Sequence, residues 1–203
     1  MGQGQRQETF ARTLNALAAA LAGLCLVTGS AWAQNPFSLL GRAVTTTMDA
    51  RTRAEVATDT EISAAASKRL LDDKKAEWAG VTLLVFAQHA VIAGAVKSAD
   101  VKKRVEELVR QDKRIRTLKN ELQVGDAGSL ARDTALETEI NATLTAAKGV
   151  SSVNMRWCAT GGRVVLMGVA QSQHEADVAL QKVRAISGVK SLVSHLRVVA
   201  PKK

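Results

Sequence analysis

The sequence predicts an α+β protein built from one small unit that occurs twice, each time in the order helix, strand, strand, helix, strand. The first observation behind this prediction is a repeat, because the segment 92–98 recurs 74 residues later as 166–172. The second is that the same step pairs apolar residues along the chain, for instance Val109 with Val183. Such self-similarity indicates two copies of one fold, each with its own small core.

The first half of the second copy is the most regular part. A capping-box pattern at 134–137 predicts a helix whose apolar residues share one face, namely Leu136, Ile140 and Leu144. Apolar and polar residues then alternate over 153–160, which predicts a half-buried strand. Gly161-Gly162 predicts a tight hairpin turn, and 164–169 is the return strand.

The second half of this copy is a helix followed by a strand. Ser172-x-x-Glu175 predicts a second capped helix with an inner stripe of Ala176, Ala179, Leu180 and Val183. Gly188 accepts the left-handed conformation in which many helices end. The last strand is expected over 189–199.

The first copy repeats this order less regularly. Thr58-x-x-Glu61 predicts the cap of its first helix, Ser98 precedes its second, and its strands are expected over 81–86, 91–96 and 115–124. The hairpin turn falls at Gln88-His89, and Arg114 stands where the second copy has Gly188. Because these residues lack the conformational freedom of glycine, we expect longer or more strained connections at both places.

The strand 81–86 is apolar on both faces, which is typical of a strand that is covered on both sides. Helices cover one face, so we expect the other to pack against the second copy or against a partner, through Leu84, Phe86 and Val91. In the second copy, the face opposite Trp157 carries Cys158, Val165 and Met167. A mixed apolar face of this kind also fits a surface that binds other proteins or another copy of the chain.

The first 33 residues match a secretory signal peptide. Two arginines precede a run of mostly Ala and Leu over 14–27, a small-x-small pattern follows at 31–33, and we predict cleavage after Ala33. An uncleaved membrane anchor is the alternative, although the run is shorter than the ~20 residues that a span needs. Cys25 follows a leucine, which is a poor context for lipid attachment.

The rest of the chain divides by the repeat. We expect a tether or amphipathic helix over 34–57, the first domain over 58–125, a linker over 126–132 and the second domain over 133–200.

The chain is basic, with 28 Lys and Arg against 19 Asp and Glu and a formal net charge of +9. It has no Tyr and only 3 Phe and 3 Trp, which argues against aromatic platforms for nucleic acid. For an exported protein, a basic surface favours anionic phospholipid headgroups or acidic polymers as partners.

The basic residues are densest on the second helix of the first copy and in the turn after it. We expect a lipid-docking patch centred on Arg110, Lys113, Arg114 and Arg116, with Lys102 and Lys103 beside it. The alternative is a solvated face neutralised by helix pairs such as Lys103–Glu107 and Glu106–Arg110.

No pattern in the sequence predicts catalysis, a metal site or a cofactor. The histidines His89, His174 and His195 lack ligand spacing with an acid or a cysteine. Gly161-Gly162 is a turn and not a phosphate-binding loop. Cys158 is the one cysteine after residue 33; we expect a half-buried strand residue there, with an intermolecular disulfide as the alternative. We therefore expect no enzyme and no small-molecule substrate.

The ordered set of these features resembles the BON domain family, named for bacterial osmotically induced and nodulation proteins. The resemblance is carried by 164–169, Ser172-x-x-Glu175 and 186–193 in the second copy, and by 59–62, 92–94 and Ile115 in the first. Segment 59–62 is matched with 137–140 of the second copy. Gly94, Gly168 and Gly188 belong to this signature as glycines of the fold.

This resemblance implies two αββαβ sandwiches, each with a three-stranded mixed sheet and two helices on one face. It also implies a non-enzymatic periplasmic protein linked to osmotic or membrane stress and to outer-membrane integrity. Proteins of this family are thought to contact phospholipid, and the alternative role is an assembly module that binds envelope proteins or itself.

Overall fold

The computed structural model describes residues 49–74 and 79–200. The expected signal peptide, its cleavage site and most of the expected tether lie outside this range. Among the described residues, none of the helices combines the length and the apolar character that a membrane crossing requires.

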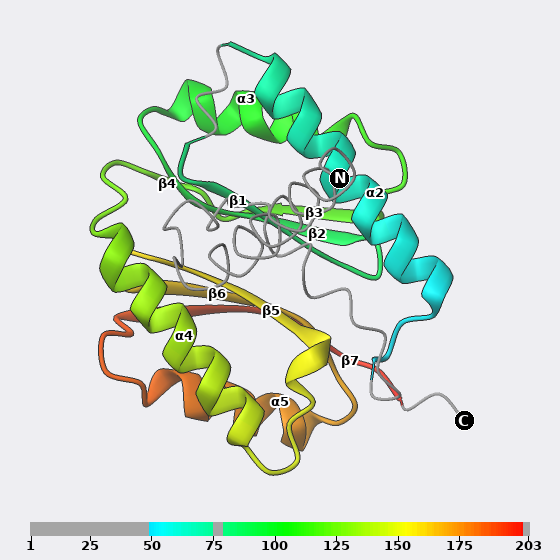
Figure 1. The fold of residues 1–203 in the computed structure, drawn as a ribbon, viewed down its shortest axis with the longest axis vertical. Helices are drawn as coiled ribbons and strands as arrows, with labels where there is room; N and C mark the ends of the chain where they lie inside the picture. Colours follow the sequence, from blue (N-terminus) through cyan, green and yellow to red (C-terminus); the bar gives the residue numbers. More distant parts are fainter. Residues whose placement is uncertain (1–48, 75–78, 201–203) are drawn as a thin grey trace, which may run out of the picture. The chain divides into compact units, whose positions relative to one another are not determined.

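The first domain has the predicted order of elements (Figure 1). Its elements are α2 (Arg53–Asp72), β1 (Val81–Phe86), β2 (His89–Val96), α3 (Ala99–Arg110), β3 (Thr117–Asn120) and β4 (Gln123–Val124). Strand β2 is central, because it pairs antiparallel with β1 and parallel with β3 and β4. Helices α2 and α3 cover one face of this mixed sheet (Figure 1).

The second domain repeats this arrangement. It consists of α4 (Leu130–Ala146), a 3-10 turn (Ser152–Asn154), β5 (Met155–Thr160), β6 (Arg163–Ala170), α5 (Gln173–Arg184) and β7 (Ser191–Val198). Strand β6 pairs antiparallel with β5 and parallel with β7, and α4 and α5 lie on one face of the sheet (Figure 1). The α+β fold class and the two tandem sandwiches are thus confirmed.

Each domain has an apolar core between its helices and its sheet. The predicted helix stripes are part of these cores, because Ile62, Ala66 and Leu70 of α2 are fully buried in the first. Their counterparts in α4, buried in the second core, are Leu136, Ile140 and Leu144.

A third apolar cluster joins the other faces of the two sheets; we call it the interdomain layer. It contains Leu84, Phe86, Val91 and Ala93 of the first domain with Cys158, Val165, Met167 and Val169 of the second. The second face of β1 is therefore covered, as expected, and the cover is the second domain. Strand β5 was expected to be half-buried and this is wrong, since its polar-looking face, with Arg156 and Cys158, is buried against the first domain.

Both first helices begin earlier than predicted. Helix α2 is capped by Thr52, whose hydroxyl accepts from the Glu55 N–H at 3.2 Å while the Glu55 carboxylate accepts from the Thr52 N–H at 2.7 Å. Thr58 lies inside the helix and donates to the Ala54 carbonyl at 2.9 Å. Such a bond to the preceding turn lets threonine sit within a helix, so the cap expected at Thr58 is wrong.

In the second domain, α4 begins after Ser129, and Thr134 lies inside it. The carboxylate of Glu137 does not close a capping box, because it accepts from the Ala159 N–H of β5 at 2.8 Å. The cap expected at 134–137 is therefore wrong as well. The hydroxyls of Ser98 and Ser172 do cap their helices, each accepting from the N–H three residues on. The capping box expected at Ser172 is only half formed, because the Glu175 carboxylate accepts from the N–H groups of Gln171 and Ser151.

The hairpin of the first domain turns at Ala87-Gln88, one residue before the predicted place. Phe86 pairs with His89, so the connection has two residues and is no longer than Gly161-Gly162. Ala87 and Gln88 have φ of 50° and 65°, the left-handed region that non-glycine residues avoid, so the expected strain is present. Arg114 does not share it, because no other described non-glycine residue has positive φ.

Candidate functional site

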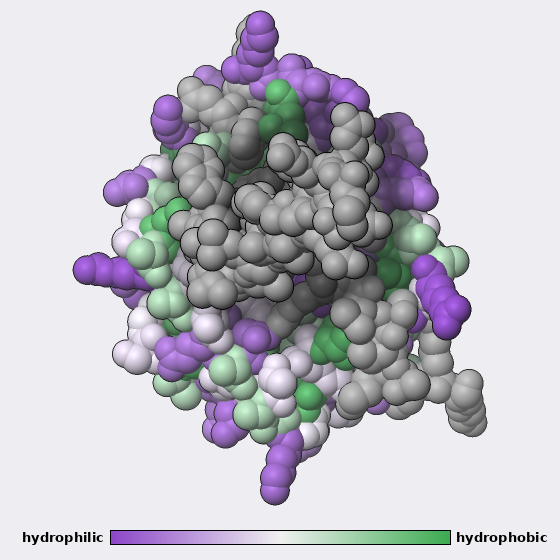
Figure 2. Space-filling model, viewed as in Figure 1, coloured by the Kyte–Doolittle hydropathy of each residue, from purple (hydrophilic) through white to green (hydrophobic). Residues whose placement is uncertain are grey.

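The six residues of the expected lipid-docking patch fall into two groups. Three are engaged within the protein: Arg110 pairs with Glu106, Arg114 lies 2.7 Å from both Asp112 and Glu61, and Lys102 donates to the Leu122 carbonyl at 2.7 Å. The other three, Lys103, Lys113 and Arg116, are exposed and have no ion pair within the described ranges. Hydrophilic side chains predominate along the upper rim of Figure 2, on the side of the view where α2 and α3 lie.

The ion pairs expected for a solvated face are present in part. Glu106 pairs with Arg110 as proposed, whereas Glu107 contacts Arg104 at 3.5 Å in place of Lys103. Hydrogen bonds from Asn120 and Arg110 hold the pKa of Glu106 below its ordinary value. The expected patch is thus partly neutralised, and Lys103, Lys113 and Arg116 are its free members.

Asp112 links the end of α3 to the patch. Its carboxylate is buried, accepts from the Arg114 guanidinium at 2.7 and 2.9 Å, and lies 3.4 Å from Arg69. The hydrogen bonds from Arg114 outweigh the effect of burial and lower the pKa of Asp112 from 3.8 to about 2.

We expect Asp112→Asn to lower the free energy of unfolding by about 2 kcal/mol at pH 7. A lowered pKa contributes stability above the unfolded-state value, and this contribution is lost as the pH falls through the folded-state value. The difference between variant and wild type should therefore shrink between about pH 4 and pH 2. Urea unfolding at several pH values measures it.

Asp72→Asn is the control for this prediction, because the Asp72 side chain is 63% exposed in its pair with Lys68. We expect it to cost less than about 0.5 kcal/mol at any pH. Equal losses from the two variants would contradict the role given to Asp112.

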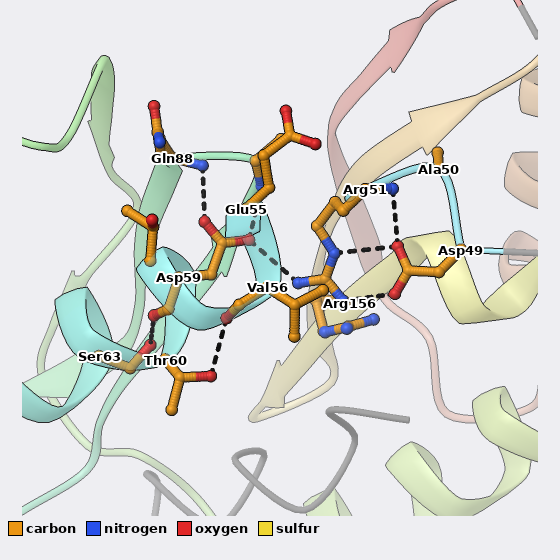
Figure 3. A network of polar contacts seen from close by, with 12 residues as sticks. Asp49, Ala50, Arg51, Glu55, Val56, Asp59, Thr60, Ser63, Gln88 and Arg156 are labelled. Atoms are coloured by element: carbon orange, nitrogen blue, oxygen red, sulfur yellow. Dashed lines mark hydrogen bonds and ion pairs between the residues drawn. The ribbon is translucent and has the colours of Figure 1, made fainter. Parts of the chain in front are cut away.

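A polar network lies next to the interdomain layer (Figure 3). The Arg51 guanidinium donates to Asp59 at 3.0 Å and to Asp49 at 2.8 Å, and it lies 4.3 Å from the centre of the Phe86 ring. The Ala50 N–H donates to the Asn154 side chain of the second domain at 2.8 Å. The segment before α2 therefore contacts both domains.

Asp59 also supports the strained hairpin turn. Its carboxylate accepts from the Ala87 N–H at 2.8 Å and the Gln88 N–H at 2.7 Å (Figure 3). Asp133 has the same role in the second domain, since it accepts from the Gly161 N–H at 3.0 Å. The two aspartates are one repeat step apart, so segment 59–62 corresponds to 133–136, and the match with 137–140 was one helical turn too far.

A second interdomain contact is centred on Glu121. Its carboxylate accepts from Arg163 of β6 at 2.6 Å and lies 2.9 Å from Nε2 of His195 in β7. Burial opposes ionisation, but the bonds from Arg163 and His195 outweigh it and lower the pKa of Glu121. One acid thus contacts two basic side chains of the other domain.

Not far along the same strands, three basic side chains gather without such an acid; we call them the junction cluster. His89 begins β2 and Arg116 precedes β3 in the first domain, and Arg197 lies in β7 of the second. Burial, then Arg197 and Arg116, lower the pKa of His89, while Asp59 opposes them. Burial and Arg116 lower the pKa of Arg197.

The residues expected at an exposed docking face lie in the interdomain layer. Leu84, Phe86, Val91, Cys158, Val165 and Met167 are each at most 4% exposed and cover one another. Burial, followed by the charge of Glu137, raises the pKa of the Cys158 thiol to about 11. The thiol is therefore protonated and out of reach of a second molecule in this arrangement.

The second domain has an open pocket of about 420 Å³ at the start of α4. It is lined by Ser129, Arg132 and Glu139 of α4, by the turn Gly161-Gly162 and by Gly188 with Lys190. One repeat step earlier, the first domain has Arg114 bonded to Glu61 across the same place. The three residues 161, 162 and 188 leave it open because they have no side chains.

The glycines of the expected signature have distinct positions. Gly94 and Gly168 have φ of 115° and 133°, and a Cβ on either would lie within about 2 Å of a carbonyl oxygen, that of Gly80 or of Asn154. Gly188 has φ of 94°, with open space around it. Across the described ranges, no three His, Cys, Asp or Glu side chains are grouped to hold a metal ion.

Comparison with known proteins agrees with this architecture. The chain is 26% identical over 179 residues to Osmotically-inducible protein Y of Escherichia coli K12, which covers 85% of this chain and 89% of that protein. It is 30% identical over 124 residues to an uncharacterized protein in the gshII 5′ region of Anaplasma centrale, covering 59% of this chain and 82% of that one.

Among solved structures, the C-terminal domain of CdsD, a structural protein of the type III secretion system of Chlamydia trachomatis, aligns over 66% of this chain and 63% of that one. The TM-score is 0.30 at 14% identity, which does not establish a shared fold. The family model of the BON domain matches residues 58–126 and 132–200, one match for each repeat. The chain therefore belongs to the BON domain family, of which it carries two domains.

Proposed function

We propose that this chain is a non-enzymatic protein of the periplasm, released by cleavage after Ala33, that supports the cell envelope under osmotic or membrane stress by docking on anionic phospholipid. The name of the relative from Escherichia coli supports the link to osmotic stress. The observation that carries the docking proposal is the set of exposed, unneutralised cations on α3 and in the turn after it, Lys103, Lys113 and Arg116.

Simple electrostatics gives the strength of such docking. A basic side chain near an anionic bilayer contributes about 1 kcal/mol, so three free cations give about 3 kcal/mol and reversible binding. Arg110 and Arg114 contribute less, because Glu106, Asp112 and Glu61 already neutralise them. The alternative role, binding proteins through exposed sheet faces, has no support from the described residues, because those faces pack against each other.

Flotation with phosphatidylglycerol vesicles tests the proposal. Lys113→Ser combined with Arg116→Ser removes two free cations and is expected to weaken binding about 30-fold, which corresponds to about 2 kcal/mol. The binding of the wild type should itself fall between 50 and 300 mM NaCl, since the Debye length falls below about 10 Å above 0.1 M salt.

The matched control removes the same charge from the second domain, with Lys182→Ser and Arg184→Ser at the exposed end of α5. We expect this variant to bind nearly as well as the wild type. Equal loss in both double variants would mean that net charge and not this patch determines docking, and no binding by the wild type would overturn the proposal.

A further inference from the structure

We propose that the junction cluster, His89 and Arg116 of the first domain with Arg197 of the second, is a binding site for a phosphate-type anion. The inference goes beyond membrane docking, because it concerns a defined anion site built from both domains and applies whether the phosphate is free or part of a lipid headgroup.

The alternation of side chains along β2 places His89 toward the second domain. Ala90 and Ile92 belong to the core under the helices, whereas Val91 and Ala93 belong to the interdomain layer. His89 is two residues from Val91 and therefore shares its face. It pairs with Thr117 of β3, and its Nδ1 lies 2.6 Å from the Thr117 hydroxyl.

The same alternation places Arg197 toward the first domain. In β7, Leu192 and Leu196 pack on the core of the second domain, while Val193 and Val199 pack on the interdomain layer. Arg197 shares the face of these two valines, and His195 on that face reaches Glu121 of the first domain at 2.9 Å.

Arg116 completes the cluster from the turn before β3. Its N–H donates to the Gln88 carbonyl at 2.8 Å. This bond holds the backbone of Arg116 beside the hairpin turn that immediately precedes His89. Its side chain is exposed, while His89 and Arg197 are half-buried. The site is therefore open to solvent on the Arg116 side, and its inner part is shielded from water.

The cluster lacks the acid that the neighbouring interdomain contact has. Glu121 contacts both Arg163 and His195, but neither Arg116 nor Arg197 makes an ion pair or a side-chain hydrogen bond within residues 49–74 and 79–200. Asp59 is the acid in range, and its oxygens are occupied by Arg51 and by the N–H groups of Ala87 and Gln88. The two guanidinium groups repel each other and disfavour a charge on His89, and an anion bound between the three side chains would relieve this repulsion.

The chemistry of the three groups fits phosphate. Two guanidinium forks present paired N–H donors at the spacing of phosphate oxygens, and such charge-assisted bonds are the strong ones. Since Nδ1 of His89 faces the Thr117 hydroxyl, Nε2 is the nitrogen that remains for the ligand. Burial, Arg197 and Arg116 lower the pKa of His89 in the free protein, while Asp59 raises it. A bound anion would favour the imidazolium form and so raise this pKa.

The test is a titration of the full chain with inorganic phosphate, monitored by NMR of the His89 ring and of the Thr117 amide, with NaCl at matched ionic strength as the reference. We expect saturable shifts with phosphate and a rise in the pKa of His89 relative to chloride. Arg116→Ser combined with Arg197→Ser should weaken binding at least 10-fold, whereas Lys182→Ser with Arg184→Ser should leave it unchanged.

Shifts that do not saturate, or a pKa of His89 that is the same in phosphate and chloride, would overturn the proposal. The NMR titration and the pKa of His89 are measured on the wild type, so they test the proposal even if the double variant fails to fold. Equal binding by the double variant and the wild type would overturn it as well.

Vesicles of phosphatidylglycerol then identify the source of the phosphate. Because Arg116 also belongs to the docking patch, the flotation arm uses Arg197→Ser alone. If this variant binds inorganic phosphate weakly and also floats less with vesicles, the headgroup is the ligand; if it floats like the wild type, the site takes a free phosphate. A wild type that binds phosphate but no vesicle would refute the proposed docking and leave the anion site in place.

Discussion

Gly168→Ala is expected to lower the free energy of unfolding by roughly 3–5 kcal/mol, because the added methyl group meets both a backbone clash and a strained backbone conformation. Gly168 has φ of 133°, and a Cβ there would lie 2.1 Å from the Asn154 carbonyl oxygen and 3.0 Å from Cα of Met155. Both contacts are backbone, and Met155 is paired with Gly168 in the β5–β6 ladder, so neither can move without breaking the hairpin. Urea unfolding followed by circular dichroism measures the loss.

Gly125→Ala separates the two causes of this loss. Gly125 has nearly the same φ, 138°, but nothing lies within 4 Å of its ideal Cβ. The variant therefore carries the backbone strain without the clash, and we expect it to cost about 1–2 kcal/mol. If Gly168→Ala and Gly125→Ala lowered the free energy of unfolding equally, the close approach of β5 to Gly168 would contribute nothing to the loss.

The pattern of apolar residues predicted the elements well, because burial against a domain's own helices leaves a period in the sequence. Ile62 and Leu70 on α2 and Leu136 and Leu144 on α4 are spaced for one helical face, and all of them are buried. The repeat also predicted that the elements of the first domain would follow the order of those in the second. This holds for the third strand of the first domain, although that strand is less regular than β7. That strand is divided into β3 and β4, where the Asn120 side chain accepts from the Leu122 N–H at 3.2 Å.

The start of α2 could not be located, because the capping-box pattern occurs there in more than one phase. The start of α4 could not be located, because Ser129 makes no side-chain cap hydrogen bond and no capping-box pattern marks it. Thr52 and Thr58 both stand three residues before a glutamate, and the correct one is decided by contacts of the segment before the helix, such as Arg51 with Asp59. Those contacts join residues far apart in the chain or outside any periodic pattern.

The burial of β5 was missed for a related reason. Arg156 and Cys158 alternate with apolar residues and look solvent-facing, yet the first domain covers them, with Arg156 5.4 Å from the Phe86 ring. The alternation within β5 cannot distinguish a polar residue that faces the other domain from one that faces solvent. The contact between the domains was predicted from β1, which is apolar on both faces, and this prediction correctly named Leu84 and Phe86 of β1 with Val91 of β2.

For the candidate sites, the sequence predicted only where basic residues are concentrated, and not which of them are paired. The sequence indicates that basic residues are concentrated after α3, but it cannot show that Arg114 is bound to Asp112 while Arg116 is free. Arg197 was missed altogether, since it is 81 positions from Arg116 and only the packing of the two sheets brings them together. The spacing of Asp59 and Asp133 by one repeat step was the signal that could have identified the buried aspartates.

Asp59→Asn is expected to lower the free energy of unfolding by about 3 kcal/mol, because removing one charge from a buried pair leaves its partner uncompensated. Asp49 keeps part of the charge of Arg51 neutralised. The amide, however, offers one oxygen where the carboxylate offers two, and those two accept three donors, from Arg51, Ala87 and Gln88. Either orientation of the amide therefore turns its own N–H groups toward a buried donor.

The loss should be local as well as global. Ala87 and Gln88 hold a left-handed turn without glycine, and their bonds to Asp59 offset this strain, so their amide hydrogens should exchange faster in the variant. Asp133→Asn is the matched control from the other domain: Asp133 accepts from one N–H, that of Gly161, and a glycine turn needs no such support. We expect it to cost no more than about 1 kcal/mol. Equal losses at the two positions would show that the stability comes from the repeated aspartate and its turn, and that Arg51 and the segment before α2 add nothing to it.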